Sequence, residues 1–80
     1  MTKKSFEDIY RLIENTSYTI VTNVPTTDFM NNTYDQTERF NSIDIKRVGK
    51  FEEFIIIYLT KNRAIYLPYE NIIMILSKNK

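Results

Sequence analysis

The chain has 80 residues and contains no cysteine, histidine or tryptophan, a length that suits one small domain. The missing residue types exclude disulfide bonds, Cys- or His-based metal sites and the Ser-His and Cys-His pairs of nucleophilic catalysis within this chain. Eleven basic and ten acidic side chains give a formal net charge of +1. The whole chain therefore lacks both the basic excess of a nucleic-acid-binding domain and the acidic excess of a DNA mimic, although a local patch stays open. We expect a single domain over residues 1–80 that is not an enzyme and takes no cofactor.

Composition and hydropathy also bear on location and source. Hydrophobic residues make up 42% of the chain and charged residues 26%, a balance typical of globular proteins. No apolar segment of the signal-peptide kind follows the first residues, and the longest apolar run, residues 54–59, is far shorter than the roughly 20 residues of a membrane-spanning helix. We expect a soluble, cytoplasmic protein without a membrane partner. Phe, Ile, Lys, Asn and Tyr account for 38 of the 80 residues; their codons are A/T-rich, as in many phage and mobile-element genes of low-GC bacteria.

The first predicted element is an amphipathic helix over residues 5–14. Its apolar side chains follow at i, i+3, i+4 and i+7 and so form one stripe: Phe6, Ile9, Tyr10 and Ile13. Ser5 precedes two acidic residues in the pattern of a capping box, since a serine hydroxyl can accept a hydrogen bond from the backbone N–H three residues later. We expect this stripe to pack on a sheet.

Strands are predicted for most of the remaining chain. β-branched and aromatic residues dominate five segments, which cover about residues 18–24, 40–48, 51–60, 64–67 and 72–76. Gly49 and residues 61–63 supply turns between them. Pro68 ends the fourth strand, because proline cannot donate to a sheet ladder.

Residues 25–39 are predicted to form one long loop. Loops of about fifteen residues are uncommon in compact domains, and those that occur are often functional. Phe29, Met30 and Tyr34 are large apolar side chains among polar neighbours in this segment. Two interpretations stay open: these side chains hold the loop on the domain surface, or they contact a partner.

Two predicted strands are apolar on both faces, and this determines the fold that we expect. In residues 51–60 one face carries Ile55, Ile57 and Leu59, and the other carries Phe54, Ile56 and Tyr58. A single short helix covers one face of a sheet, so the second face needs either closure of the sheet or another chain. The predicted fold class is α+β: an N-terminal helix followed by a five-stranded, curled antiparallel sheet, forming a small SH3-like or Sm-like barrel.

Residues 51–57, Phe-Glu-Glu-Phe-Ile-Ile-Ile, resemble the Phe-Asp-x-Phe motif and apolar strand of the Sm-like family, which includes bacterial RNA chaperones. Ile65-Tyr66 and residues 72–75 resemble the last two strands of that family, so the resemblance covers about a third of the chain. It implies a ring in which the last two strands pair between subunits and Phe54 stacks on a base. Leu67-Pro68 replaces the family's Lys-His pair and its upstream glycines are missing, so the family's RNA-binding residues do not carry over.

The acidic residues do not suggest a metal site. Glu52 and Glu53 are neighbours on a predicted strand, where consecutive side chains point to opposite faces and cannot share an ion. Asp28, Asp35 and Glu38 lie in the predicted loop without the spacing or the glycine of a calcium-binding loop. We therefore predict no metal ligand.

Three functions remain open. The first is a small non-catalytic protein-binding module that acts stoichiometrically, as a phage- or mobile-element-encoded inhibitor of a host defence protein. Aromatic residues, Met and Arg are enriched at interfaces, and the predicted partner-binding residues are Phe29, Met30, Tyr34 and Arg39. The second is an Sm-like RNA- or single-stranded nucleic-acid-binding protein, in which basic residues contact phosphates and one ring stacks on a base: Arg39, Lys46, Arg47, Lys50 and Phe54. The third is a homo-oligomeric structural component.

Overall fold

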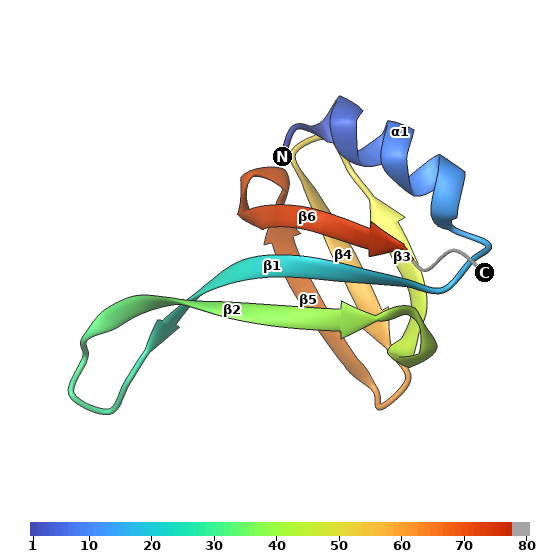
Figure 1. The fold of residues 1–80 in the computed structure, drawn as a ribbon. Coiled ribbons are helices and arrows are strands. Elements are labelled where there is room, and N and C mark those ends of the chain that lie inside the picture. Colours follow the sequence, from blue (N-terminus) through green and yellow to red (C-terminus); the bar gives the residue numbers. More distant parts are fainter. Residues whose placement is uncertain (78–80) are drawn as a thin grey trace.

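The computed structural model describes residues 1–77 and consists of one helix followed by antiparallel strands (Figure 1). The elements are α1 (Lys3–Ile13), β1 (Tyr18–Thr27), β2 (Thr33–Asn41), the 3₁₀ turn η1 (Ser42–Asp44), β3 (Ile45–Lys50), β4 (Phe54–Leu59), β5 (Arg63–Pro68), the 3₁₀ turn η2 (Tyr69–Asn71) and β6 (Ile72–Ser77). The strands form two three-stranded antiparallel sheets: sheet A, in the order β2-β1-β6, and sheet B, in the order β3-β4-β5. The predicted α+β class and the helix-first antiparallel order are confirmed.

The strand count and the sheet arrangement differ from the prediction. The described residues contain six strands in two sheets rather than five strands in one curled sheet, and they do not form a closed barrel. The predicted strand over residues 40–48 is interrupted by η1, where the chain leaves sheet A for sheet B. The Ser42 hydroxyl accepts a hydrogen bond from the Tyr18 backbone N–H at 3.1 Å, and the Asp44 carbonyl accepts one from Thr60 N–H at 3.0 Å. These contacts fix the turn between the two sheets.

The predicted loop over residues 25–39 is wrong: most of it is a β-hairpin. β1 and β2 pair continuously from Thr19 opposite Asn41 to Thr27 opposite Thr33. The pairing of β1 with β6 ends at Thr22, so at Pro25 β1 pairs with β2 alone among the described strands. A proline is tolerated there, because its missing backbone N–H can face the unpaired side of the strand. The far half of this hairpin extends past the other strands (Figure 1), and the molecule is 44 Å long and 26 by 21 Å across.

The helix starts earlier than predicted. Thr2, not Ser5, is the N-cap, because the Thr2 side chain accepts a hydrogen bond from the Ser5 backbone N–H at 3.1 Å. This contact satisfies one of the free N–H groups of the first turn. The helix ends at Ile13 and its predicted apolar stripe is confirmed, since Phe6 and Tyr10 are buried.

The core lies between the two sheets, beneath α1. Phe6 stacks on Tyr10 with ring centroids 5.3 Å apart, and Tyr10 meets Tyr18 edge to face at 5.4 Å. The inner row of β4 adds Ile55 and Ile57, both fully buried. The complete buried cluster is Phe6, Tyr10, Tyr18, Ile20, Phe40, Ile55, Ile57, Leu67, Tyr69 and Ile72.

The outer face of β4 is the second apolar face that the sequence indicates. Phe54, Ile56 and Tyr58 alternate with the buried inner row and are half-buried. β4 begins at Phe54 rather than at residue 51, because the chain turns at Phe51, whose N–H donates to the Phe54 carbonyl at 3.0 Å. This turn positions the Phe51 ring beside the outer face, as described below.

Candidate functional site

The tip of the β1–β2 hairpin is a rigid turn built around Asp28. Its carboxylate accepts hydrogen bonds from the backbone N–H groups of Met30 at 2.9 Å and Asn32 at 3.0 Å. The Asp28 carbonyl accepts a third from Asn31 N–H at 3.0 Å, and the Asp28 N–H donates a fourth to the Asn32 carbonyl at 3.0 Å. Asn31 has a φ of 65°, which asparagine tolerates better than most residues. The turn is thus fixed by its own hydrogen bonds, without support from the core.

This turn directs two large apolar side chains into solvent. Phe29 is 96% exposed and Met30 is 68% exposed. Tyr34 follows at the start of β2, opposite Thr26, and is also exposed. The predicted partner-binding residues Phe29, Met30 and Tyr34 therefore lie together at the end of the hairpin.

Arg39 does not belong to this group. It lies five residues after Tyr34 on the same strand, so it points to the opposite face about 16 Å away. Its Cα pairs with that of Val21 near the middle of sheet A. The structure thus separates Arg39 from the other three predicted partner-binding residues.

The outer face of sheet B carries a continuous group of aromatic rings, which we call the aromatic face: Phe51, Phe54, Tyr58 and Tyr66. Phe51 stacks on Phe54 with centroids 4.9 Å apart and planes 16° apart. Phe54 lies 4.5 Å from Tyr66 on the neighbouring strand. Tyr66 is 61% exposed and Phe51 is 44% exposed, so the group opens to solvent at both sides of Phe54.

Gly49 makes room for this arrangement. A Cβ atom at this position would lie 3.1 Å from the Phe51 ring and 3.4 Å from the Tyr58 ring. A side chain here would therefore push the Phe51 ring aside by a few tenths of an ångström.

Basic side chains adjoin one end of the aromatic face. The Arg47 guanidinium carbon lies 4.0 Å from the centroid of the Tyr58 ring, a cation–π contact. A hollow of about 280 Å³ beside it is lined by Lys46, Arg47, Tyr58, Leu59, Asn62, Arg63 and Ala64. Among residues 1–77 no carboxylate lines this hollow.

The predicted nucleic-acid residues are only partly brought together. Lys46, Arg47 and Phe54 belong to sheet B and adjoin its outer face. The Lys50 ammonium instead lies 5.3 Å from the Tyr10 ring, next to α1, and Arg39 is in sheet A. Phe51, Tyr58 and Tyr66 were not among the predicted site residues. Tyr58 could have been predicted, because it lies four residues after Phe54 on the same strand and so shares its face.

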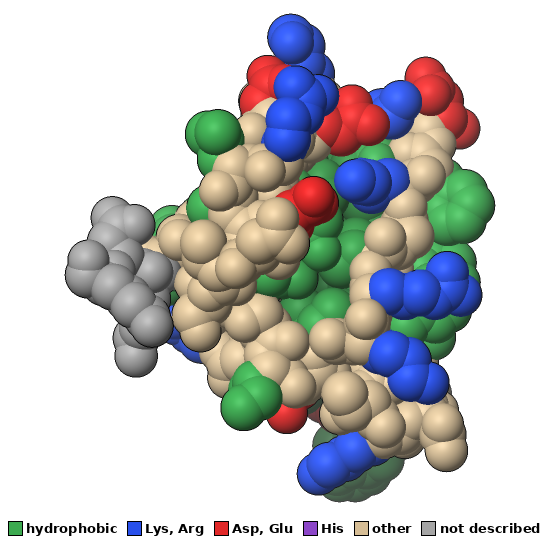
Figure 2. Space-filling view, turned by 90° about the vertical axis from the view of Figure 1, so that its right-hand side faces the viewer, with side chains coloured by type: hydrophobic (Ala, Val, Ile, Leu, Met, Phe, Trp, Pro, Cys, Tyr) green, Lys and Arg blue, Asp and Glu red, His purple; other side chains and the backbone are tan. Residues whose placement is uncertain are grey.

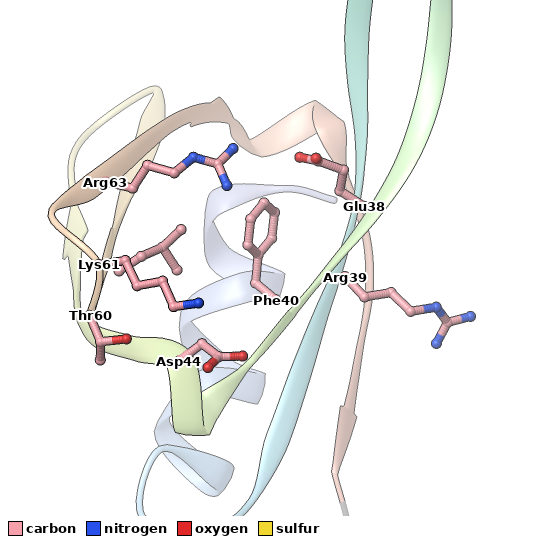
Figure 3. A pocket seen from close by; sticks show the side chains of 8 residues that line it. Glu38, Arg39, Phe40, Asp44, Thr60, Lys61 and Arg63 are labelled. Atoms are coloured by element: carbon pink, nitrogen blue, oxygen red, sulfur yellow. The ribbon is translucent and has the colours of Figure 1, made fainter.

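Another pocket opens between the two sheets and has mixed charge (Figure 3). It has a volume of about 360 Å³ and lies between β2, η1 and the β4–β5 turn. Lys61 points into it from the turn and Arg63 from the start of β5 (Figure 3). Glu38 and Phe40 point into it from β2, whereas Arg39 points away (Figure 3). Neither sign of charge dominates, so the pocket does not select an anion or a cation.

The side of the molecule where α1 ends is hollowed over the core. Figure 2 shows hydrophobic side chains at its centre and Lys and Arg side chains along one margin. A cavity of about 470 Å³ lies here between the end of α1, η1 and β3, and its basic lining residues are Lys46 and Arg47. The basic margin of sheet B is therefore reachable from this side as well as from the outer face.

Three buried tyrosines are structural. The hydroxyls of Tyr10 and Tyr18 lie 3.0 Å apart and share a hydrogen bond. Burial is the larger cause, and this hydrogen bond the second, of the raised pKa of Tyr18. The Tyr69 hydroxyl donates to the Phe51 carbonyl at 2.7 Å, and burial raises the pKa of Tyr69. The phenols of Tyr18 and Tyr69 are therefore neutral hydrogen-bonding groups near pH 7 and not bases.

Two further features concern residues 1–77 alone. No helix in this part of the chain has the length and apolarity needed to cross a membrane. No three acidic side chains in the same range come together in a way that could hold a metal ion. Asp28, the most engaged carboxylate of the hairpin, is used by the turn itself.

No protein-family model, curated protein or solved structure matches the chain.

Proposed function

We propose that the protein is a non-catalytic protein-binding module that acts stoichiometrically through the tip of its β1–β2 hairpin. The observation that carries this proposal is the exposure of Phe29 and Met30 on a turn held by four hydrogen bonds. Large apolar side chains on a fixed backbone are good interface anchors, because little conformational entropy is lost when they bind.

The charge of the hairpin supports a protein partner rather than a nucleic acid. Residues 25–37 include Asp28 and Asp35 and no Lys or Arg. A polyanion would be repelled here, whereas a protein with an apolar pocket and a basic rim would be complementary. The composition of the chain, rich in residues with A/T-rich codons, supports the further proposal of a phage- or mobile-element-encoded inhibitor of a host defence protein.

A finer description of the fold belongs with this proposal. We propose that sheets A and B are the two halves of a small, incompletely closed SH3-like or Sm-like barrel, in which β2 and β3 form one strand bent at η1. The pairing of β6 with β1 and the position of η2 just before β6 support it. Cross-strand amide contacts in an NMR structure would test the continuity of β2 with β3.

Hairpin variants test the binding role. The double variant Phe29→Ala, Met30→Ala removes both anchors, and Leu12→Ala is a matched control because Leu12 is 81% exposed on α1. We expect affinity capture from a bacterial lysate, quantified by mass spectrometry, to lose one protein with the hairpin variant and retain it with the control. Equal recovery with the two variants would contradict the proposal.

A homo-oligomeric structural role is the second candidate, and β6 favours it. This strand is at an edge of sheet A and has no charged residue, and Ile73, Met74 and Leu76 on it are exposed. Uncharged apolar edges are sites of strand pairing between chains. Sedimentation of the wild type and of Met74→Lys decides this, since a wild-type monomer at high concentration would eliminate it.

A further inference from the structure

We propose that the outer face of sheet B is a second binding site, whose ligand is single-stranded nucleic acid. In this site the aromatic face stacks on bases, and Lys46 and Arg47 contact phosphates. The site is distinct from the hairpin tip and goes beyond the proposed protein-binding function.

The stacking part of the site is the ordered series of rings on two strands and a turn. Phe51, Phe54 and Tyr66 are consecutive neighbours with centroids 4.9 and 4.5 Å apart. The exposed Phe51 and Tyr66 flank the half-buried Phe54, so the outer rings offer aromatic surface to solvent while the inner ring anchors them. Aromatic side chains presented in this way stack on unpaired bases of any sequence.

The charge of sheet B favours a polyanion. Residues 45–68, which contain sheet B, carry five cations, Lys46, Arg47, Lys50, Lys61 and Arg63, against Glu52 and Glu53. Of these cations Lys46 and Arg47 adjoin the outer face, whereas Lys50 lies beside the Tyr10 ring and Lys61 points into the pocket between the sheets (Figure 3). Glu52 is paired with Lys3 at 3.0 Å, which offsets part of its charge. The whole-chain net charge of +1 conceals this excess, because the hairpin carries acidic residues.

The Phe54 ring and the Arg47 guanidinium lie toward opposite ends of the outer face of β4. Tyr58, which holds the Arg47 guanidinium, lies four residues from Phe54 on the same face, a distance of about 13 Å. A strand of nucleic acid lying along β4 thus meets the phosphate-contacting residues at one end and the stacking rings at the other. Paired bases cannot reach the rings, so a duplex should bind weakly.

The experiment is fluorescence anisotropy of the full chain with a labelled, mixed-sequence single strand of about eight nucleotides, an oligonucleotide length within the usual range for such folds. Tyr66→Ala should weaken binding by about five- to a hundredfold, which corresponds to the loss of one base stack. Tyr66→Phe keeps the ring and should bind like the wild type. Phe29→Ala, on the hairpin, is the control for a change outside the site.

The salt dependence tests the phosphate contacts. The logarithm of the affinity should fall linearly with the logarithm of salt concentration, and Arg47→Gln should reduce that slope by about 0.7. Circular dichroism of each variant checks that the fold is intact, and because Tyr66 and Arg47 are exposed we expect unchanged spectra.

Four results would overturn the proposal. They are absence of binding at low salt, equal affinity for a duplex of the same sequence, equal affinity of Tyr66→Ala and Tyr66→Phe, and loss of wild-type self-association in Tyr66→Ala by sedimentation. The last would identify the aromatic face as a contact between copies of the chain. None of these results depends on the hairpin, so the protein-binding proposal is tested separately.

Discussion

Tyr10 and Tyr18 share a hydroxyl–hydroxyl hydrogen bond of 3.0 Å in the core, where their rings meet at 83°. One residue comes from α1 and the other from the start of β1, so this contact joins the helix to sheet A. It is polar, buried and made by side chains that are otherwise apolar.

Removing both hydroxyls should destabilise the fold by less than the two single removals added together. Tyr18→Phe leaves the Tyr10 hydroxyl buried without this partner, and we expect the free energy of unfolding to fall by about 1–3 kcal/mol. In the double variant Tyr10→Phe, Tyr18→Phe no hydroxyl is stranded, so the loss should be smaller than the sum of the two single losses. Urea titrations of the four proteins measure the coupling, and additive losses would show that the two hydroxyls are independent.

The same pair predicts an alkaline transition. Burial, and secondly the bond to Tyr10, raise the pKa of Tyr18 in the folded protein above its usual value near 10. The folded state therefore favours the neutral phenol, and its contribution to stability is complete below about pH 10 and is lost as the pH rises through the higher folded-state pKa. Melting temperatures from pH 8 upward should fall more steeply for the wild type than for Tyr18→Phe above about pH 10. Parallel curves would contradict the assignment.

The helix cap offers a test at the N-terminus. Thr2→Ala removes the hydroxyl that accepts from Ser5 N–H, and we expect a loss of about 1 kcal/mol in the free energy of unfolding. Thr2→Ser keeps the hydroxyl and should stay close to the wild type. If Ser5→Ala were the more costly change, Ser5 would be the cap after all.

The hairpin turn should loosen without unfolding the domain. Asp28→Ala removes the carboxylate that accepts from Met30 and Asn32, and the turn lies outside the core. We expect faster amide hydrogen exchange at these two residues, with a change in global stability within about 0.5 kcal/mol. Asp28→Asn, which keeps an acceptor oxygen, is the matched control. Unchanged exchange in Asp28→Ala would show that the turn is held by other contacts.

Local patterns predicted the helix and most strand positions. Apolar residues that recur every 3.6 residues indicate a helix, and those that recur every second residue indicate a strand, so both patterns can be recognised within a short segment. The N-cap was misplaced because two hydroxyls, Thr2 and Ser5, both stand at the helix start, and sequence alone does not say which one accepts the bond. The buried stripe of the helix was predicted correctly, because the spacing of four residues between Phe6 and Tyr10 places both side chains on the same face of a helix.

Non-local pairing explains what the sequence did not reveal. Pro25 is compatible with a strand because β6 stops pairing with β1 at Thr22, a fact that depends on residues fifty positions away. The aromatic face likewise depends on the register that puts Tyr66 opposite Ile56 on β4, next to Phe54. Phe54 could be singled out from its strand, but its neighbours in the site could not.

The length of the hairpin beyond Thr22 can change without altering the core. Beyond Thr22 the two strands pair with each other alone among the described residues, so their length is not tied to the packing of the interior. Adding one residue to each strand would carry the tip about 3.3 Å outward and turn its side chains over, whereas adding two would extend it and keep their orientation. Such insertions would match the length of the hairpin to binding pockets of different depth and leave the core unchanged.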